Sequence, residues 1–507
     1  MDTMLLTLIT FSPLLGLVLL AFIPRTQAGT IKLIGILSTV LPLLLTFVMY
    51  AGFDFNLAAL QFHEQIRWFA IPADQVEFPI YYEMGVDGLS MPLVMLAALI
   101  GFFASVAGAI FIKKRWKEFY ILFLIMLIGM IGVFTSQNLF LFFIFFEFTL
   151  IPMFFIMGIW GYVEREKAAF KFLLYNGVGS AIMLIVFVAL FMNVWTLSFK
   201  EIADALTNPM SPYNIQEAPG YIDETLRYGL FLALLIAFAI KMPIAPLHTW
   251  MVKAYQESPA PAVLVSSGVL IKIGAYGLIR FNIGFFPEVA MDMAQVLAVL
   301  GLINIIYGAL LALVQKSLKM VLAYSSLSHM GIVLLGLASM NAVGFQGAIF
   351  QMVSHGLVAA LMFFIVSMIF ERTSTAELED LGGLAKSMPF VAGMFLAAAM
   401  ASAGLPGMSG FISEFMAFLG LFREMPIHAA IGTLGIILTA VYLLRAVLGT
   451  TYGPTPERWA SLSDARPLEV LPMVIILGFI LLIGVYPSVL SDPMQATLHN
   501  IVPRIGG

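Results

Sequence analysis

The sequence predicts an all-α, polytopic membrane protein with about 14 transmembrane helices, and two observations carry that prediction. Of its 507 residues, 61% are hydrophobic and only 11% are charged, whereas about 25% of the residues of a soluble domain are charged. The apolar residues also gather in runs of about 20, the length that a helix needs to cross the hydrocarbon core. A mean hydropathy of +1.01 agrees with both observations and excludes a soluble globular protein.

The apolar runs follow one another along the whole chain. The first, near 3–23, has no basic segment before it and no small-residue cleavage site after it, so we expect a retained helix and not a signal peptide. The remaining runs lie near 31–50, 86–111, 118–135, 138–157, 168–195, 227–256, 259–281, 292–314, 317–338, 344–370, 389–421, 428–450 and 469–487.

Two of these runs are interrupted. The seventh contains Pro243 and Pro246 directly after Lys241, and the twelfth contains the segment AGLPGMSGF at 403–411. A proline inside a helix removes a backbone hydrogen bond and clashes with the preceding turn. In lipid, an unwound backbone survives only where protein or water satisfies it. A broken membrane helix that carries a lysine therefore indicates an ion path.

The interruptions fall at matching places in two sets of five helices, the fourth to eighth and the ninth to thirteenth. Because five is an odd number, the second set must insert upside down relative to the first, which predicts an inverted repeat. We therefore expect four parts: three N-terminal helices in 1–117, the first five-helix repeat in 118–281, the second in 282–451, and the last helix with its tail in 452–507.

Basic residues predict the orientation of the helices. Loops after odd-numbered helices hold 17 Lys and Arg, while loops after even-numbered helices, with the C-terminus, hold 6. Loops rich in Lys and Arg face the cytoplasm, so both termini are expected on the outer side. The long loops 51–85 and 196–226 are expected there too, and their acids and prolines predict small solvated caps.

The absence of cysteine restricts the chemistry of this chain. With Cys 0, disulfides, thiolate metal sites and iron–sulfur ligation by this chain are excluded. The 6 histidines are scattered and show no zinc or haem-attachment spacing. We therefore expect neither a metal site nor a bound cofactor here.

Four ionisable residues lie within the predicted spans, namely Glu147, Lys241, Lys272 and Glu414. Burial disfavours the charged form of a lysine or a carboxylate, and a neighbouring opposite charge restores it. Making and breaking such a pair can load and unload a proton, so these four are candidate proton carriers. Glu147 is the expected partner of Lys241. A static pair that only fixes packing is the alternative, although buried pairs gain little over apolar packing and charges within membranes are usually functional.

Three histidines, His248, His329 and His355, also lie at or within spans. Histidine titrates near neutrality, so these residues could relay protons between the lysines and Glu414. The sequence leaves an alternative open, in which a neutral histidine is bonded to a serine hydroxyl such as that of Ser328 or Ser354.

Five segments resemble a known family closely. They are FFEFTLIPMFFIMGIWG (145–161), the run 241–280, SLKMVLAYSSLSHMG (317–331), DLGGLAKSMP (380–389) and GLPGMSGFISEF (404–415). Together they resemble the antiporter-like membrane subunits of respiratory complex I, and the resemblance spans nearly the whole chain.

The resemblance implies a fourteen-helix fold and assigns roles to several residues. It implies that Glu147, Lys241 and Lys272 carry protons, and it places the three membrane histidines on family positions. Other antiporter-like subunits tend to have lysine at the helix-12 position, where this chain has Glu414. That glutamate, together with LIPMFFIMGIWG and GVDGLSMPL (85–93), favours one branch of the family.

The resemblance also implies a translocase subunit of NADH–quinone oxidoreductase that holds no redox centre. NADH, FMN, iron–sulfur clusters and quinone would then bind in partner subunits. The expected setting is the bacterial cell (inner) membrane, and the expected partners are other membrane subunits of complex I, including neighbouring antiporter-like chains, and lipids, with no nucleic acid. Two other functions stay open: a subunit of an Mrp-type Na⁺/H⁺ antiporter, and a passive membrane scaffold, which the four intramembrane charges disfavour.

Overall fold

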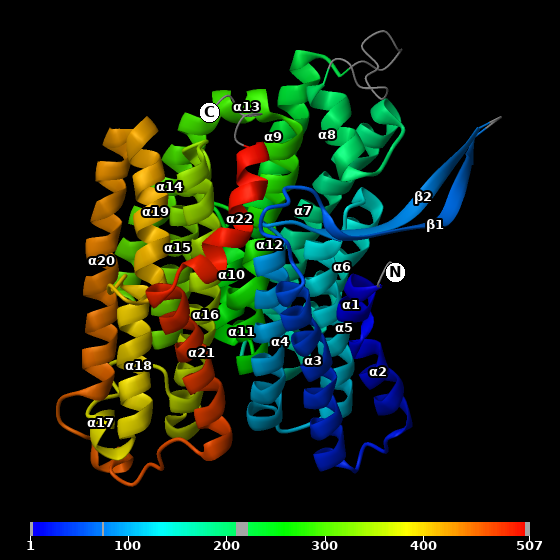
Figure 1. Ribbon diagram of the computed structural model, residues 1–507. Coiled ribbons are helices and arrows are strands. Elements are labelled where there is room, and N and C mark those ends of the chain that lie inside the picture. The colour runs from blue at the N-terminus through cyan, green and yellow to red at the C-terminus, as the bar shows by residue number, and fades with distance from the viewer. Residues whose placement is uncertain (1–3, 74–75, 209–221, 502–507) are drawn as a thin grey trace.

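The computed structural model describes residues 4–73, 76–208 and 222–501, and it is a bundle of long helices that run across a single slab (Figure 1). Within the described residues, 12 helices are long and apolar enough to cross a membrane. Eleven of them consist of α1 (Leu5–Phe11) with α2 (Pro13–Phe22), α3 (Ala28–Ala51), α4 (Met91–Phe111), α5 (Trp116–Thr135), α6 (Leu139–Trp160), α7 (Arg165–Val194), α14 (Ala294–Val314), α15 (Leu318–Ala338), α16 (Ala342–Thr373), α20 (Pro426–Thr451) and α21 (Pro467–Val485).

The twelfth long helix changes its winding twice. It is built from α11 (Ala260–Val265), the π-helical segment η1 (Ser266–Leu270), α12 (Ile271–Gly277) and a second π-helical segment η2 (Leu278–Ile283). A π-helical turn inside an α-helix is rare and often marks a functional site. Lys272 lies between the two π-helical segments.

Both predicted interruptions are present. The seventh span divides into α9 (Glu224–Lys241) and α10 (Thr249–Glu257), and the twelfth divides into α18 (Pro389–Ser402) and α19 (Ser409–Glu424). With these two interrupted spans the structure accounts for the fourteen that the sequence predicts, and the all-α membrane class is confirmed. Shorter helices connect the spans: α8 (Phe199–Thr207), α13 (Pro287–Asp292), α17 (Leu384–Ser387), the 3₁₀ segment η3 (Glu457–Trp459) and α22 (Ser488–Ile501).

The sequence reasoning predicted neither the short connecting helices nor a β-hairpin in the loop 51–85. Strands β1 (Gln61–Ala73) and β2 (Val76–Val86) pair antiparallel and project from the bundle (Figure 1). The buried carboxylate of Glu64 ties the hairpin to the bundle, because its Oε1 accepts a hydrogen bond of 2.8 Å from the backbone N–H of Leu6. An isolated two-stranded hairpin is marginally stable in water, so this packing matters. In the second predicted cap, 196–226, the structure adds α8, while Glu217 and its neighbours in 209–221 lie outside the described residues.

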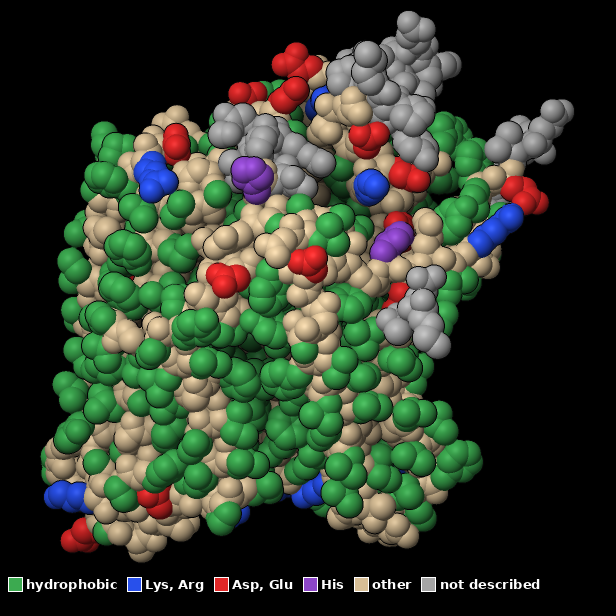
Figure 2. Space-filling view, in the orientation of Figure 1, with side chains coloured by type: hydrophobic (Ala, Val, Ile, Leu, Met, Phe, Trp, Pro, Cys, Tyr) green, Lys and Arg blue, Asp and Glu red, His purple; other side chains and the backbone are tan. Residues whose placement is uncertain are grey.

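The two ends of the bundle differ, and we name them for what they carry. The hairpin face bears β1, β2, α8 and α13, and the opposite face bears the loops at 23–27, 112–115, 161–164 and 374–388. Figure 2 shows charged side chains gathered toward these two ends, with mostly hydrophobic side chains between them. That distribution suits a surface surrounded by lipid.

The helices are enclosed to very different degrees. Nearly every residue of the span Ala260–Ile283 is buried inside the protein, whereas most residues of α3 are exposed or half-buried. The enclosed spans are the ones that carry Lys272, His329 and His355. These three ionisable residues are therefore shielded from lipid, as their cost in hydrocarbon requires.

Candidate functional site

The break between α9 and α10 is held open by a side chain from another span. Asn304 on α14 accepts a hydrogen bond of 2.7 Å from Ala245 N–H through its Oδ1, and it donates through Nδ2 to Pro243 O at 3.2 Å. The indole of Trp250 donates to Ile240 O at 2.8 Å. These bonds satisfy the backbone that the prolines release, which is the condition for an unwound segment at membrane depth.

The span Ala260–Ile283 packs directly against this break. A Cβ at Gly274 would lie 2.5 Å from Met242 N, so only glycine allows the two backbones to approach this closely. Lys241, at the end of α9, and Lys272, on the span Ala260–Ile283, therefore lie on adjoining spans.

Lys241 ends α9 and is almost completely buried. Its Nζ donates to Thr149 Oγ1 on α6 at 3.3 Å and lies 4.6 Å from the centroid of the Phe146 ring. Glu147, on the same turn of α6, interacts with Lys241 electrostatically. Among the described residues the two make no ion pair, and the buried Oε1 of Glu147 has no hydrogen-bond partner. The charges are thus close but separated.

At the opposite-face end, α10 is anchored by Glu164 in the loop before α7. The Glu164 carboxylate accepts hydrogen bonds from Lys253 on α10 and from Lys167, and these bonds lower its pKa to about 2. The carboxylate therefore stays ionised at neutral pH and holds α10 in place.

Lys272 lies near the middle of its span and is fully buried. Its Nζ donates to the carbonyl of Ser267, five residues earlier, which lies in the π-helical segment η1. Its Nζ also lies 2.8 Å from Nδ1 of His355 on α16. A lysine and a histidine in direct contact form a pair through which a proton can pass.

From His355 the contacts continue sideways to Glu414. The rings of His355 and His329 lie 5.3 Å apart between centroids, and His329 Nδ1 is 3.6 Å from Oε1 of Glu414 on α19. Glu414 lies just after the second helix break, against Gly404, where a Cβ would be 2.8 Å from its Oε2. All three side chains are buried.

Polar side chains that sequence reasoning missed hold His329 in this line. Gln351 Nε2 is 3.0 Å from His329 Nδ1, Ser402 Oγ is 3.1 Å from His329 Nε2, and Ser413 donates to the Gln351 amide oxygen. Gln351 is four residues from His355 and so shares its helix face. A polar residue at that spacing inside an apolar span was the available signal.

The structure therefore joins four of the seven candidate residues and leaves three apart. Lys272, His355, His329 and Glu414 make one row of contacts, which we call the buried line. Glu147 and Lys241 form a separate group. His248, at the start of α10, packs edge-on against Tyr307 at 5.4 Å, and its Nδ1 has no partner among the described residues. Ser328 and Ser354 bond Ile305 O and Ser409 instead of the histidines.

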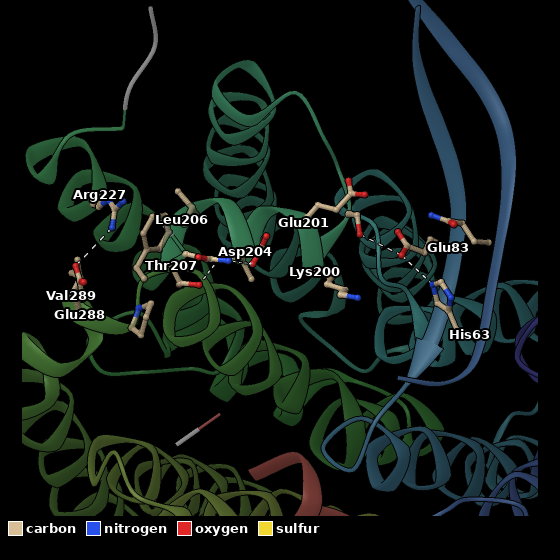
Figure 3. Close-up of a pocket in the computed structure, with 16 residues that line it drawn as sticks. His63, Glu83, Lys200, Glu201, Asp204, Leu206, Thr207, Arg227, Glu288 and Val289 are labelled. Atoms are coloured by element: carbon tan, nitrogen blue, oxygen red, sulfur yellow. Dashed lines mark hydrogen bonds and ion pairs between the residues drawn. The ribbon is translucent and has the colours of Figure 1, made fainter. Parts of the chain in front are cut away.

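A cavity of 850 Å³ opens at the hairpin face, away from the buried line. Figure 3 shows His63 on β1 directed at Glu83 on β2, with Lys200 and Glu201 of α8 on the other side. His63 Nε2 lies 3.1 Å from Glu83 Oε1, and Ser198 donates to the same oxygen at 3.3 Å. A second cavity of 500 Å³ shares His63, Glu83 and Lys200 and extends inward to Asp87 and Arg280.

Comparison with known proteins gives one family for the greater part of the chain. The model of the family described as NADH:quinone oxidoreductase/Mrp antiporter, transmembrane, matches residues 136–439. This range includes every candidate residue of the buried line and also Glu147, Lys241 and His248.

Full-length relatives are similar as well. The NADH-quinone oxidoreductase subunit M of Rhodobacter capsulatus is 37% identical over 507 residues, which cover 98% of this chain and 96% of the relative. The NAD(P)H-quinone oxidoreductase chain 4 of Gloeobacter violaceus is 38% identical over 508 residues, with 98% and 92% covered.

Solved structures share the fold. A chain of respiratory complex I from Thermus thermophilus with bound NADH superposes with a TM-score of 0.85 at 28% identity, covering 99% of this chain and 100% of that one. A chain of the Mrp complex from Dietzia sp. superposes with a TM-score of 0.84 at 21% identity, over 100% of this chain and 99% of that one. At that identity the second likeness concerns the fold alone.

Proposed function

Because the chain belongs to the NADH:quinone oxidoreductase/Mrp antiporter transmembrane family, we propose that it is the antiporter-like, proton-translocating subunit of a respiratory complex I, of the type called M or chain 4. It works as a membrane subunit of a translocase, together with other membrane subunits. Electron transfer in those other subunits drives the proton movement.

The observation that carries this function is the buried line. Four groups that can each gain and lose a proton, Lys272, His355, His329 and Glu414, lie in contact across the middle of the bundle. No membrane scaffold requires such a row, since each ionisable group costs free energy when it is buried.

The geometry supports a sequence of proton transfers along this line. The Lys272 ammonium gives its proton to His355 Nδ1 across the 2.8 Å contact, and His355 passes on a proton from its other nitrogen. His329 then receives it and delivers it to the Glu414 carboxylate 3.6 Å away. Gln351 and Ser402 hold the His329 ring before this exchange, and the bond from the Gln351 amide to Nδ1 breaks when Nδ1 carries the proton toward Glu414.

Glu147 and Lys241 act as the controlling pair in this proposal. When the Lys241 ammonium moves from Thr149 toward Glu147, the pair closes and its charge no longer opposes a proton on Lys272. The first five-span unit, 118–281, thus contains the controlling pair and Lys272, the first proton carrier. The second unit, 282–451, contains the rest of the buried line. His248, near the helix break, stays a proposed relay between the two lysines.

The chain works among partner subunits in a membrane. NADH, FMN, iron–sulfur clusters and quinone belong to partner subunits. The membrane is the bacterial inner membrane, with both termini and the hairpin face on its outer side. The relatives named for quinone oxidoreductases share 37% to 38% identity, while the Mrp complex supports the fold alone, so the antiporter reading is the weaker one.

Replacement of Lys272 tests the proposed function. We expect Lys272→Met and Lys272→Arg to abolish proton pumping, since neither methionine nor arginine can give up a proton. Lys386→Met is the matched control, because Lys386 is exposed on the opposite face. The measurement is NADH-driven proton uptake in membranes that contain the assembled complex, with assembly checked on native gels. Normal pumping by the assembled Lys272→Met variant would contradict the role of the buried line.

A further inference from the structure

One buried ion pair lies outside the buried line, at the hairpin end of the span that carries Lys272. Arg280 Nη2 lies 2.5 Å from Asp87 Oδ1, and both side chains are largely buried, with exposed fractions of 14% and 7%. The Asp87 oxygen also accepts hydrogen bonds from Leu89 N, Ser90 N and Ser90 Oγ at 3.0 to 3.2 Å. A surface ion pair would not need so many partners.

Lys272, Tyr276 and Arg280 follow one another at intervals of four residues on the same helix. Residues four apart lie one above the other on a helix, so Tyr276 separates the lysine from the arginine. Tyr276 is fully buried, lies 5.1 Å from the Arg280 guanidinium and packs edge-on against Phe134 at 5.2 Å. The aromatic rings of Tyr276 and Phe134 therefore close the way from Arg280 to Lys272.

From Arg280 toward the hairpin face, in contrast, the path is polar and open. Asp87 and Arg280 line the inner end of the 500 Å³ cavity, and His63, Glu83 and Lys200 line its outer part. Figure 3 shows this outer part, with His63 and Glu83 facing each other beside Lys200. Two buried atoms, Glu83 Oε2 and Arg280 Nε, have no hydrogen-bond partner among the described residues and can bind water there.

Neither member of the ion pair can carry a proton. An arginine side chain does not deprotonate in proteins. Burial raises the pKa of Asp87, but the Arg280 guanidinium and the hydrogen bonds from Ser90 and Leu89 outweigh burial, so its pKa lies below the ordinary value. A fixed guanidinium at the end of a narrow path repels an incoming proton.

We propose that Asp87, Arg280 and Tyr276 form a seal that closes the Lys272 span to the hairpin face. A proton on Lys272 then has no direct way into the cavity at the hairpin face, and it must travel sideways through His355 to Glu414. The seal determines the direction of proton transfer, although its own residues do not take up the proton. The inference rests on the proposed function only in taking Lys272 as a proton carrier.

The test measures passive proton leakage through assembled complex in liposomes, with no NADH present and an imposed pH gradient. We expect Arg280→Gln to raise the proton conductance severalfold and to lower the number of protons pumped per electron. Arg227→Gln is the control, because Arg227 also lies on the hairpin face but pairs with the exposed Glu288 at 3.8 Å. The double variant Arg280→Gln with Lys272→Ala should lose the added leak.

The possible outcomes decide between a seal and other roles. An assembled Arg280→Gln variant with unchanged leak and unchanged proton-to-electron ratio would overturn the proposal. Reduced pumping without any leak would overturn it as well, because it would make the pair a release path. If the single variant does not assemble, Asp87→Asn with Arg280→Gln leaves no uncompensated charge, and its leak decides. The leak assay needs no electron transfer, so a failure of the seal can be told apart from a failure of NADH-driven pumping.

Discussion

At the scale of single residues, the separation of Lys241 from Glu147 gives a direct prediction. Lys241→Ala removes the buried positive charge that interacts with Glu147, so the pair between α9 and α6 can no longer form. We expect Lys241→Ala and Glu147→Ala each to depress both proton pumping and NADH–quinone activity by tenfold or more, because the controlling pair can no longer switch. Lys241→Arg should fail too, since a guanidinium stays charged.

Thr149→Val is the matched control for this pair. It removes the hydroxyl that bonds Lys241 but leaves both charges in place, so it should keep most of the activity. Paired assays of quinone reduction and proton uptake in membranes with verified assembly give the result. Full activity and full pumping by Lys241→Ala would leave Lys241 and Glu147 as a packing pair.

The candidate residues could be named from the sequence because a charge in an apolar run is conspicuous. The sequence did not show which of these residues contact one another. Lys272 meets His355 because α16 and the span Ala260–Ile283 are packed side by side, which depends on tertiary structure. Gln351, Ser402 and Asn304 went unnoticed since uncharged polar residues are frequent in membrane helices.

At the scale of elements, Asn304 carries the second prediction. Asn304→Leu keeps the number and branching of the side-chain heavy atoms but leaves Ala245 N–H and Pro243 C=O without their partner. A buried backbone group left unpaired costs about 1 to 3 kcal/mol, so we expect a lower midpoint of thermal unfolding and weaker pumping. Asn193→Leu is the control, because the Asn193 side chain donates to Ala189 O within its own helix and so supports no helix break.

The unfolding midpoint of the purified complex and its pumping rate measure this effect. A stability equal to that of the Asn193→Leu variant would show that water or another side chain satisfies the break without Asn304.

The spans themselves were predictable, and the connecting elements were not. Twenty apolar residues in a row can do little other than cross a membrane as a helix, and prolines at 243 and 246 mark a break by their chemistry alone. The hairpin and α22 lie in polar segments, where no hydrophobic period separates helix from strand or loop. Their structure depends on contacts such as the bond from Leu6 N–H to Glu64.

At the scale of the whole molecule, the orientation in the membrane gives the third prediction. The chain has no cysteine, so any introduced cysteine is the only thiol in this chain. We expect Asn56→Cys, on the hairpin face, to react with an impermeant maleimide from the outside of intact cells. Lys114→Cys and Lys386→Cys, both exposed on the opposite face, should react only after the cells are opened.

The protein without cysteine serves as the blank for labelling. Reaction of Lys386→Cys in intact cells would reverse the proposed orientation. The cavity near Glu83 would then open on the cytoplasmic side of the membrane.

The buried line has a consequence for electrical work. Lys272, His329 and His355 each lie near the middle of their spans, so transfer between them runs parallel to the membrane plane. Moving one elementary charge through a membrane potential of 100 mV takes about 2.3 kcal/mol, but a parallel displacement crosses almost none of that potential. The sideways transfers are therefore electrically silent. In the proposed route the membrane voltage acts on the two remaining steps, from one face to Lys272 and from Glu414 to the other, and we expect the driving force from electron transfer to act there.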